Sequence, residues 1–245
     1  MENRIILYFT IGFPDNGTLQ EFSEAIPDHS IDYVELGYPS RRAYYDGPRI
    51  RETHESGLEN FNVNDLAKLA GTLRNKARKI YLLAYHDDFI ENRDMIYSIL
   101  KNCEFSGLII PDLLTDYFDE NSSLIQEIQD KGYEYIPFFN PSSPDKVIES
   151  VSGISNSWIY YGLMPSTGIN VPYNKDAVVS RINSIIGDRE INFGFGIRSV
   201  EDVRKLISYG AHGAAIGTLL IDMLKRRDID GFKKFVMELA VLRNA

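Results

Sequence analysis

Two acidic residues, Glu35 and Asp46, have the types and positions that acid–base catalysis requires in this 245-residue chain. Glu35 lies inside the apolar run YVELG, and strand alternation directs its side chain opposite to those of Val34 and Leu36. A carboxyl group in apolar surroundings loses hydration, which raises its pKa toward neutrality and suits it to exchange protons. The alternative is a structural glutamate paired with a base, but no lysine or arginine lies near it on the strand. We therefore predict a catalytic role for Glu35.

Asp46 follows eleven residues later, in the segment YYDGP. Taken alone, Asp-Gly-Pro is ordinary turn chemistry. The two tyrosines before it could form a wall for an aromatic substrate. If Asp46 and Glu35 lie at the same end of the fold, they form an acid–base pair, and this pairing is our prediction.

A second candidate site consists of two glycine-containing segments near the carboxyl end, FGFGI and AIGT, in which Gly196 and Gly217 are spaced 21 residues apart. Glycine lets backbone N–H groups approach an oxyanion, and Thr218 adds a hydroxyl where a helix begins. A glycine in a single loop usually marks only a turn. Two glycine loops after neighbouring strands are a more specific signal of an anion site. We predict that Gly196, Gly217 and Thr218 bind a phosphate group, with Gly168 as a third contact.

Other polar residues carry weaker signals. The four histidines show no metal-ligand spacing, so we expect surface or packing roles for them and predict no metal site. Asp112 ends an apolar run, where it either orients a catalytic group or caps the next loop. Arg41 and Arg42, between the two acids, fit a solvated pair, a partner surface or a phosphate contact. The single cysteine, Cys103, excludes an internal disulfide and is expected to be buried.

Strand and helix patterns alternate along the whole chain, which indicates a parallel sheet. Stretches of helical periodicity begin after caps at Asn62 and Ser199. Short β-branched and aromatic runs are expected to form strands at residues 4–11, 32–37, 79–85, 105–111, 133–138, 157–162, 190–194 and 212–217. An open doubly wound sheet is the rival, but no G-x-G-x-x-G motif follows the first strand. Eight units in this length predict one α/β domain, residues 1–245, folded as a (β/α)8 TIM barrel with its chemistry at the carboxyl ends of the strands.

The composition limits the possible partners. The chain has 44% hydrophobic and 25% charged residues, as in an ordinary globular protein, and a net charge of −9. No basic stripe offsets that charge, so we expect no nucleic-acid binding, while a pocket of N–H groups can still hold an anion. No apolar run approaches 18 residues and the first residues lack a signal-peptide pattern, so we expect a cytoplasmic protein without membrane contact.

The sequence resembles the alpha subunit of tryptophan synthase over nearly its whole length. The matching segments are, in order, YFTIGFPD at residues 8–15, ELGYP at 35–39, DGP at 46–48, GLIIPD at 107–112, TG at 167–168, GFGI at 194–197 and GT at 217–218. The spacing from Glu-Leu-Gly-x-Pro to Asp-Gly-Pro is the most specific element, because several phosphate-binding barrels contain something similar to Gly-Phe-Gly-Ile.

The resemblance implies a lyase of tryptophan biosynthesis that cleaves indole-3-glycerol phosphate by a retro-aldol reaction to indole and glyceraldehyde 3-phosphate. It implies that Asp46 binds the indole N–H, and that Glu35 shuttles protons between the indole carbon and the glycerol hydroxyl. No metal or organic cofactor is implied for this chain. The implied substrate-binding residues are Tyr85 and Phe195 around the indole, and Thr167, Gly168, Gly196, Gly217 and Thr218 around the phosphate.

The implied partner is a beta subunit, a pyridoxal-phosphate enzyme that receives indole through a tunnel, in an alpha2beta2 heterotetramer. The loop at residues 40–45 departs from the family pattern, because Ser-Arg-Arg-Ala-Tyr-Tyr replaces Phe-Ser-Asp-Pro-x-Ala. That loop contacts the beta subunit in the family, so coupling stays open, as does which of Ile159, Tyr160 and Tyr161 faces the substrate. Two alternatives also stay open: another phosphate-binding barrel enzyme, such as an isomerase or prenyl-phosphate synthase, and a catalytically weakened barrel that acts as a binding or regulatory subunit.

Overall fold

The computed structural model describes residues 3–117, 123–164 and 174–243. Within these residues, one parallel sheet has the order β5-β4-β3-β2-β1-β9-β8-β7-β6. Its strands are β1 (Arg4–Thr10), β2 (Ile31–Gly37), β3 (Ala77–Leu83), β4 (Gly107–Ile109), β5 (Glu134–Ile136), β6 (Phe138–Phe139), β7 (Ile159–Gly162), β8 (Ile191–Gly194) and β9 (Gly213–Ile216). Each overlaps a predicted strand, and β5 and β6 both overlap the one expected at residues 133–138.

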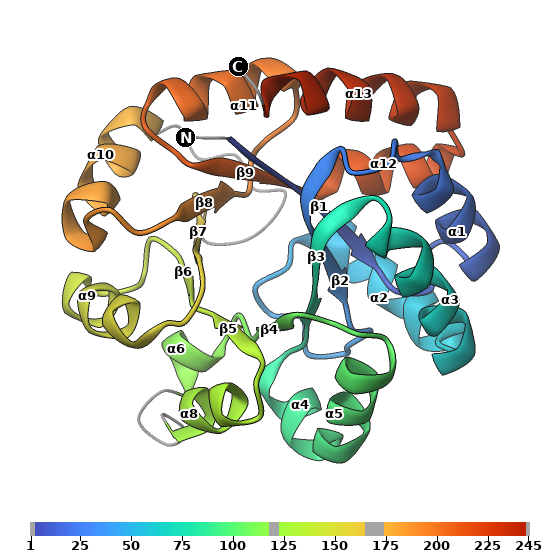
Figure 1. Cartoon of the computed structure of the whole chain (residues 1–245), viewed down its shortest axis with the longest axis horizontal. Helices are drawn as coiled ribbons and strands as arrows, with labels where there is room; N and C mark the ends of the chain where they lie inside the picture. The colour runs from blue at the N-terminus through green and yellow to red at the C-terminus, as the bar shows by residue number, and fades with distance from the viewer. Residues whose placement is uncertain (1–2, 118–122, 165–173, 244–245) are drawn as a thin grey trace.

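β5 and β6 are two parts of one barrel strand, separated by Pro137. Proline has no N–H to donate, so the ladder is interrupted there, but the Pro137 carbonyl still accepts a hydrogen bond from the Tyr160 N–H at 2.9 Å. β5 pairs with β4 and β6 pairs with β7, so the divided strand joins the two edges of the sheet. Counted once, it completes the predicted eight-stranded barrel, which Figure 1 shows with helices around it.

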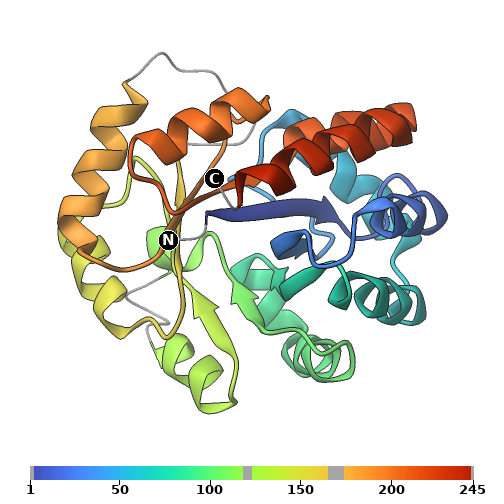
Figure 2. The same ribbon diagram turned by 45° about the horizontal axis from the view of Figure 1, so that its top comes forward.

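Helices cover the outside of the barrel. Those described are α1 (Asn16–Ala25), α2 (Pro48–Asn60), α3 (Val63–Arg74), α4 (His86–Glu91), α5 (Arg93–Asn102), α6 (Leu113–Asp116), α8 (Ser123–Asp130), α9 (Asp145–Ile154), α10 (Lys175–Ile186), α11 (Val200–Ser208), α12 (Thr218–Arg226) and α13 (Ile229–Leu242). Figure 2 shows α12 and α13 packed together on the outside of the barrel near β1. None of the described helices is long and apolar enough to span a membrane.

Local sequence explains where several helices begin. Asn62 and Ser199 cap α3 and α11 as predicted, because each side chain accepts hydrogen bonds from N–H groups of the first turn. The sequence did not predict α2. Its start has Gly47 as the cap and Pro48 at the first position, and the letters Asp-Gly-Pro fit a turn equally well.

Aromatic side chains fill the barrel near the amino-terminal ends of its strands. Trp158, just before β7, stacks on Tyr33 of β2 with ring centroids 5.3 Å apart. Tyr81 of β3 packs edge-on against both rings. Trp158 and Tyr81 are buried, as is Cys103, the last as predicted. This end of the barrel is therefore packed core, which leaves the opposite end for a site.

Asp32, next to Tyr33 on β2, joins several elements at the same end. Its side chain is fully buried and forms ion pairs with Arg4 (3.4 Å), Arg78 (3.6 Å) and Arg243 (2.9 Å). One of its oxygens also accepts a hydrogen bond from the backbone N–H of Ile5 at 3.0 Å. A buried carboxylate needs such partners to offset its lost hydration. Asp32 thereby connects β1, β2 and β3 to the chain just after α13.

Candidate active site

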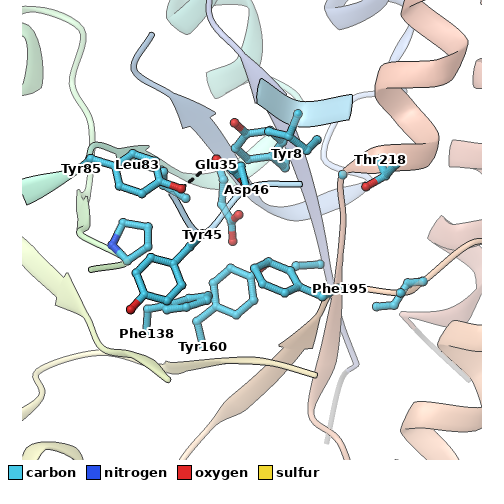
Figure 3. Close-up of a pocket in the computed structure, with 16 residues that line it drawn as sticks. Tyr8, Glu35, Tyr45, Asp46, Leu83, Tyr85, Phe138, Tyr160, Phe195 and Thr218 are labelled. Atoms are coloured by element: carbon cyan, nitrogen blue, oxygen red, sulfur yellow. Dashed lines mark hydrogen bonds between the residues drawn. The ribbon is translucent and has the colours of Figure 1, made fainter. Parts of the chain in front are cut away.

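The carboxyl ends of the strands surround a cavity of about 580 Å³, counting the space at its open mouth. Every barrel strand, or the segment that follows it, contributes to the lining. The lining residues are Tyr8, Glu35, Tyr45, Asp46, Ile50, Leu83, Tyr85, Pro111, Phe138, Tyr160, Phe195, Gly196, Ile197, Ala215, Gly217 and Thr218. Figure 3 shows two carboxyl groups among aromatic rings. Apolar walls with a few converging polar groups are typical of a small-molecule site.

Glu35 projects from β2 into this cavity, as strand alternation predicts. Its side chain is almost fully buried, and neither carboxylate oxygen has a hydrogen-bond partner among the described residues. Burial raises the pKa of Glu35 to about 8, because a charged carboxylate is poorly solvated there. Glu35 is therefore protonated at neutral pH, and it can donate a proton into the cavity and take one back.

Asp46 lines the same cavity and lies in the loop that precedes α2. Tyr85 follows β3, and its hydroxyl donates a hydrogen bond to Asp46 Oδ2 at 2.9 Å (dashed in Figure 3). His54 Nε2, on α2, lies 3.3 Å from the same oxygen. Two donors from separate elements thus fix the orientation of this carboxylate at the cavity wall. The acid pair expected from the sequence is brought together in one cavity.

The loop at residues 40–45 is held against α4 of the same chain. Arg42 forms two hydrogen bonds with Glu91, at 2.6 and 2.8 Å, and lies 3.4 Å from Asp88. The Ser40 hydroxyl donates a hydrogen bond to Asp88 as well. Arg42 therefore forms an ion pair within the chain, which was not among the roles considered for the arginines from sequence.

Aromatic rings of the cavity wall rest on glycine backbone of neighbouring strands. A Cβ atom at Gly194 would lie 2.3 Å from the Tyr160 hydroxyl, and one at Gly37 would lie 2.4 Å from the Tyr8 hydroxyl. These distances are too short for any side chain, so glycine is required if the rings are to keep their places. The pairs are Tyr8 with Gly37, Tyr160 with Gly194, and Phe195 with Gly162.

The glycine segments of the carboxyl-terminal half lie on the cavity lining. Phe195 and Gly196 follow β8 with φ angles of +70° and +69°, a left-handed conformation that favours glycine. Gly217 is the cap of α12, and Thr218 is the first residue of that helix. Backbone N–H groups at the start of a helix attract anions. The arrangement therefore offers an anion site beside the aromatic walls.

Two residues that were expected near the phosphate, Thr167 and Gly168, lie outside the described residues. Lys175, at the start of α10, lies close to the glycine loop, with its Nζ 3.4 Å from the Gly196 carbonyl oxygen. Sequence reasoning did not single out this lysine. In residues 3–117, 123–164 and 174–243, no three His, Cys, Asp or Glu side chains form a cluster that could hold a metal ion.

Asp112 is the N-cap residue of α6, but its side chain makes no capping hydrogen bond there; that it orients a catalytic group stays a prediction. It is buried but absent from the cavity lining, and its Oδ1 accepts a hydrogen bond from the His86 N–H at 2.9 Å. Its side chain thus binds the first residue of α4, which belongs to the neighbouring strand–helix unit and directly follows Tyr85. Burial raises the pKa of Asp112 to about 7, against the opposing effect of this hydrogen bond.

The structure adds residues that sequence reasoning missed. Tyr160 is the member of segment 159–161 that lines the cavity, and Tyr8 lines it from β1. His54, expected on the surface or in a packing role, contacts Asp46 instead. The buried face of α2 has helical spacing that includes His54, so recognising that helix would have placed the histidine toward the site.

The chain is similar to proteins of one family over nearly its full length. The family model described as "Tryptophan synthase alpha chain" matches residues 1–244. The tryptophan synthase alpha chain of Saccharolobus solfataricus is 32% identical over 232 residues, which cover 94% of this chain and 92% of that protein. That of Sulfurisphaera tokodaii is 31% identical, with 94% and 93% covered. A mutant tryptophan synthase alpha subunit from Pyrococcus furiosus has the same fold, with a TM-score of 0.82, 22% identity, and 98% and 99% covered.

Proposed function

Because this chain belongs to the tryptophan synthase alpha chain family, we propose that it cleaves indole-3-glycerol phosphate to indole and glyceraldehyde 3-phosphate. One observation carries the proposal: Glu35, buried and without a hydrogen-bond partner among the described residues, opens into the same aromatic cavity as Asp46. The cavity thus combines a group that exchanges protons with an anion that can stabilise a developing cation.

The proposed binding mode uses the two ends of the cavity. The indole ring lies among the aromatic side chains, including Tyr160 and Phe195, with its N–H directed at the Asp46 carboxylate. The phosphate lies at Gly217 and Thr218, where the start of α12 presents N–H groups. The glycerol chain between them then passes the carboxyl group of Glu35.

The proposed reaction begins with protonation of the ring. Glu35, protonated at neutral pH, gives its proton to the indole carbon that carries the glycerol chain. The ring becomes a cation whose charge lies largely on the nitrogen. Asp46, held by Tyr85 and His54, stabilises that charge through the N–H group.

Cleavage follows when the Glu35 carboxylate takes the proton of the hydroxyl next to the ring. The bond between the chain and the ring carbon breaks, its electron pair returns to the ring, and the oxygen-bearing carbon becomes an aldehyde. Indole and glyceraldehyde 3-phosphate result, and Glu35 is protonated again, as at the start. The protonated ring accepts the electrons, so the proposed reaction needs no cofactor from this chain.

The proposed partner is a beta subunit in an alpha2beta2 assembly, which would consume the indole. Pyridoxal phosphate would belong to that partner. The proposal rests on family membership and on the loop at residues 40–45, whose last residue, Tyr45, lines the cavity beside Asp46. The exposed Tyr44 of this loop is available for such a contact.

The direct test incubates the purified chain with indole-3-glycerol phosphate and measures indole and glyceraldehyde 3-phosphate. Equal amounts of both products are expected, and Glu35→Gln should abolish nearly all of the release. A conversion of the substrate to any other product, or no conversion with or without a beta subunit, would contradict the proposed function.

A further inference from the structure

Asp46 Oδ2 receives its two hydrogen bonds from donors that differ in chemistry. His54 is buried, and its Nδ1 accepts a hydrogen bond from the Ser40 N–H at 3.1 Å. A ring nitrogen that accepts carries no proton, so the His54 proton lies on Nε2, which faces Asp46 at 3.3 Å. The ring thus connects the beginning of the loop, at Ser40, to the acid at its end.

Arg51, one helical turn before His54 on α2, holds the main chain of the same loop. Its Nε donates to the Asp46 carbonyl at 2.6 Å and to the Ala43 carbonyl at 3.2 Å. Its Nη2 donates to the Tyr44 carbonyl at 3.0 Å. One guanidinium thus binds three carbonyl groups of a loop that has no regular structure.

We infer that Arg51 and His54 form a clamp that holds Asp46 in its reacting position before substrate or any partner binds, with His54 as a positioning residue. Both belong to α2, whose buried face contacts the barrel, so the clamp has a rigid base. Arg51 holds the backbone on either side of the turn, and His54 holds the carboxylate itself. The inference deepens the proposed function, on which its kinetic part rests.

The physical effect of the clamp is preorganisation. An unrestrained loop loses conformational entropy when it becomes ordered, and that loss costs free energy. If the loop is ordered during folding, this free-energy cost does not add to the barrier of the reaction. Asp46 is then already in place when the substrate binds. The clamp therefore makes the isolated chain an active lyase, with less dependence on a partner to order the loop.

The test compares two variants that break the clamp, His54→Leu and Arg51→Met, with two conservative variants, His54→Gln and Arg51→Lys. Glutamine keeps an amide N–H near the place of Nε2, and lysine keeps a cation that reaches a carbonyl. His212→Gln and Arg74→Met are matched controls, because His212 also accepts from a backbone N–H and Arg74 also donates to a carbonyl, both away from the cavity.

The first readout is hydrogen–deuterium exchange of residues 40–47 in the isolated chain without substrate, which does not depend on activity. We expect His54→Leu and Arg51→Met to speed exchange in this loop while β1 and β2 keep their protection, which shows that the barrel stays folded. Unchanged exchange in both variants would overturn the clamp, even if the wild type forms no indole and the proposed function fails.

The second readout is the kinetics of indole formation. His54→Leu should lower kcat about tenfold or more with a smaller change in KM, because it disturbs the acid rather than substrate binding. His54→Gln should recover most of the loss, and the controls should match the wild type. If glutamine fails to recover activity, or if kcat falls only in proportion to folded protein, His54 has a structural role and the positioning assignment is wrong.

Discussion

Arg42 forms a two-point ion pair with Glu91 of the same chain, with nitrogen–oxygen distances of 2.6 and 2.8 Å. The pair joins the loop that carries Asp46 to α4. A guanidinium and a carboxylate in this arrangement fit each other's geometry. A partner surface was one of the three roles considered from sequence for Arg41 and Arg42, but Arg42 pairs with acids of its own chain.

The first prediction concerns this pair. Arg42→Gln and Glu91→Gln should each lower kcat of the isolated chain by about two- to fivefold, because either change frees one side of the loop, and high salt should have a similar effect. Steady-state indole formation at low and high salt measures this. If Glu91→Gln leaves the isolated chain unaffected while Arg42→Gln weakens activation by a beta subunit, Arg42 serves the partner instead.

The second prediction concerns the pH dependence of catalysis. Burial raises the pKa of Glu35 to about 8, and the proposed reaction starts from the protonated form. We therefore expect kcat/KM to be high below pH 8 and to fall as the pH rises through this value. In Glu35→Gln, the residual rate should be lower by about a hundredfold or more and should lack this step. A rate that increases through pH 8 would mean that Glu35 enters the reaction as a base.

The third prediction concerns stability. An unfolded chain loses the Glu35 proton near the ordinary value of 4.5, whereas the folded chain keeps it up to about pH 8. The contribution of this group to the free energy of unfolding therefore falls as the pH rises from about 4.5 to 8. At about 1.36 kcal/mol per pKa unit, the total decrease is on the order of 3–5 kcal/mol.

Denaturant titrations of the wild type and Glu35→Gln at pH 5 and pH 9 would measure this effect. The gain in unfolding free energy of the variant over the wild type should be much larger at pH 9 than at pH 5. At pH 9 the wild type must bury a charged carboxylate, whereas glutamine carries no charge. Glu55→Gln on the exposed side of α2 is the control. If the variant and the wild type differ in unfolding free energy by the same amount at both pH values, Glu35 is not buried as a neutral acid.

The fourth prediction concerns phosphate. Thr218→Asp places a negative charge at the start of α12, where the substrate phosphate is proposed to lie. KM for indole-3-glycerol phosphate should rise by about tenfold or more through like-charge repulsion, whereas the binding of a dephosphorylated analogue should change little. Calorimetry with both ligands tests this, and equal losses would mean that the phosphate lies elsewhere.

The fifth prediction concerns Asp32. Asp32→Asn leaves three arginines at the closed end of the barrel without their shared anion. Removing one partner of a buried ion pair costs about 3–5 kcal/mol of unfolding free energy. Thermal and denaturant unfolding should show the loss, with exposed Asp188→Asn as the control. A change below about 1 kcal/mol, the value of a surface pair, would contradict the role given to Asp32.

Most of the fold could be predicted because hydrophobic patterning determines it locally. The strand expected at residues 190–194 begins within one residue of β8, since a β-branched and aromatic run ends there at a glycine. The division between β5 and β6 was not predicted, although Pro137 lies inside the expected strand. A proline in a strand is compatible with an interrupted ladder, but only the neighbouring strands show that pairing resumes after it.

The site could be predicted only in part. Glu35 was found because one charged residue in an apolar strand reveals which face points inward. Tyr160 was not assigned, because all four residues of β7 are buried and alternation gives no contrast between the faces. To place His54 from sequence, one must know which face of α2 is buried. That helix was not predicted, because the sequence Asp-Gly-Pro at its start is also typical of a turn. These residues depend on packing between elements, and a local pattern does not encode that packing.

The contacts between cavity rings and glycine backbone have an evolutionary consequence. A methyl group added at Gly194 alone would displace Tyr160, and a smaller residue in place of Tyr160 alone would expose bare backbone to the substrate. Neither single step improves the cavity, so the two positions are epistatic: each restricts what natural drift can do to the other. A redesign of the cavity, for example for a halogenated indole-3-glycerol phosphate, could therefore place a side chain at position 194 only together with a smaller residue at position 160.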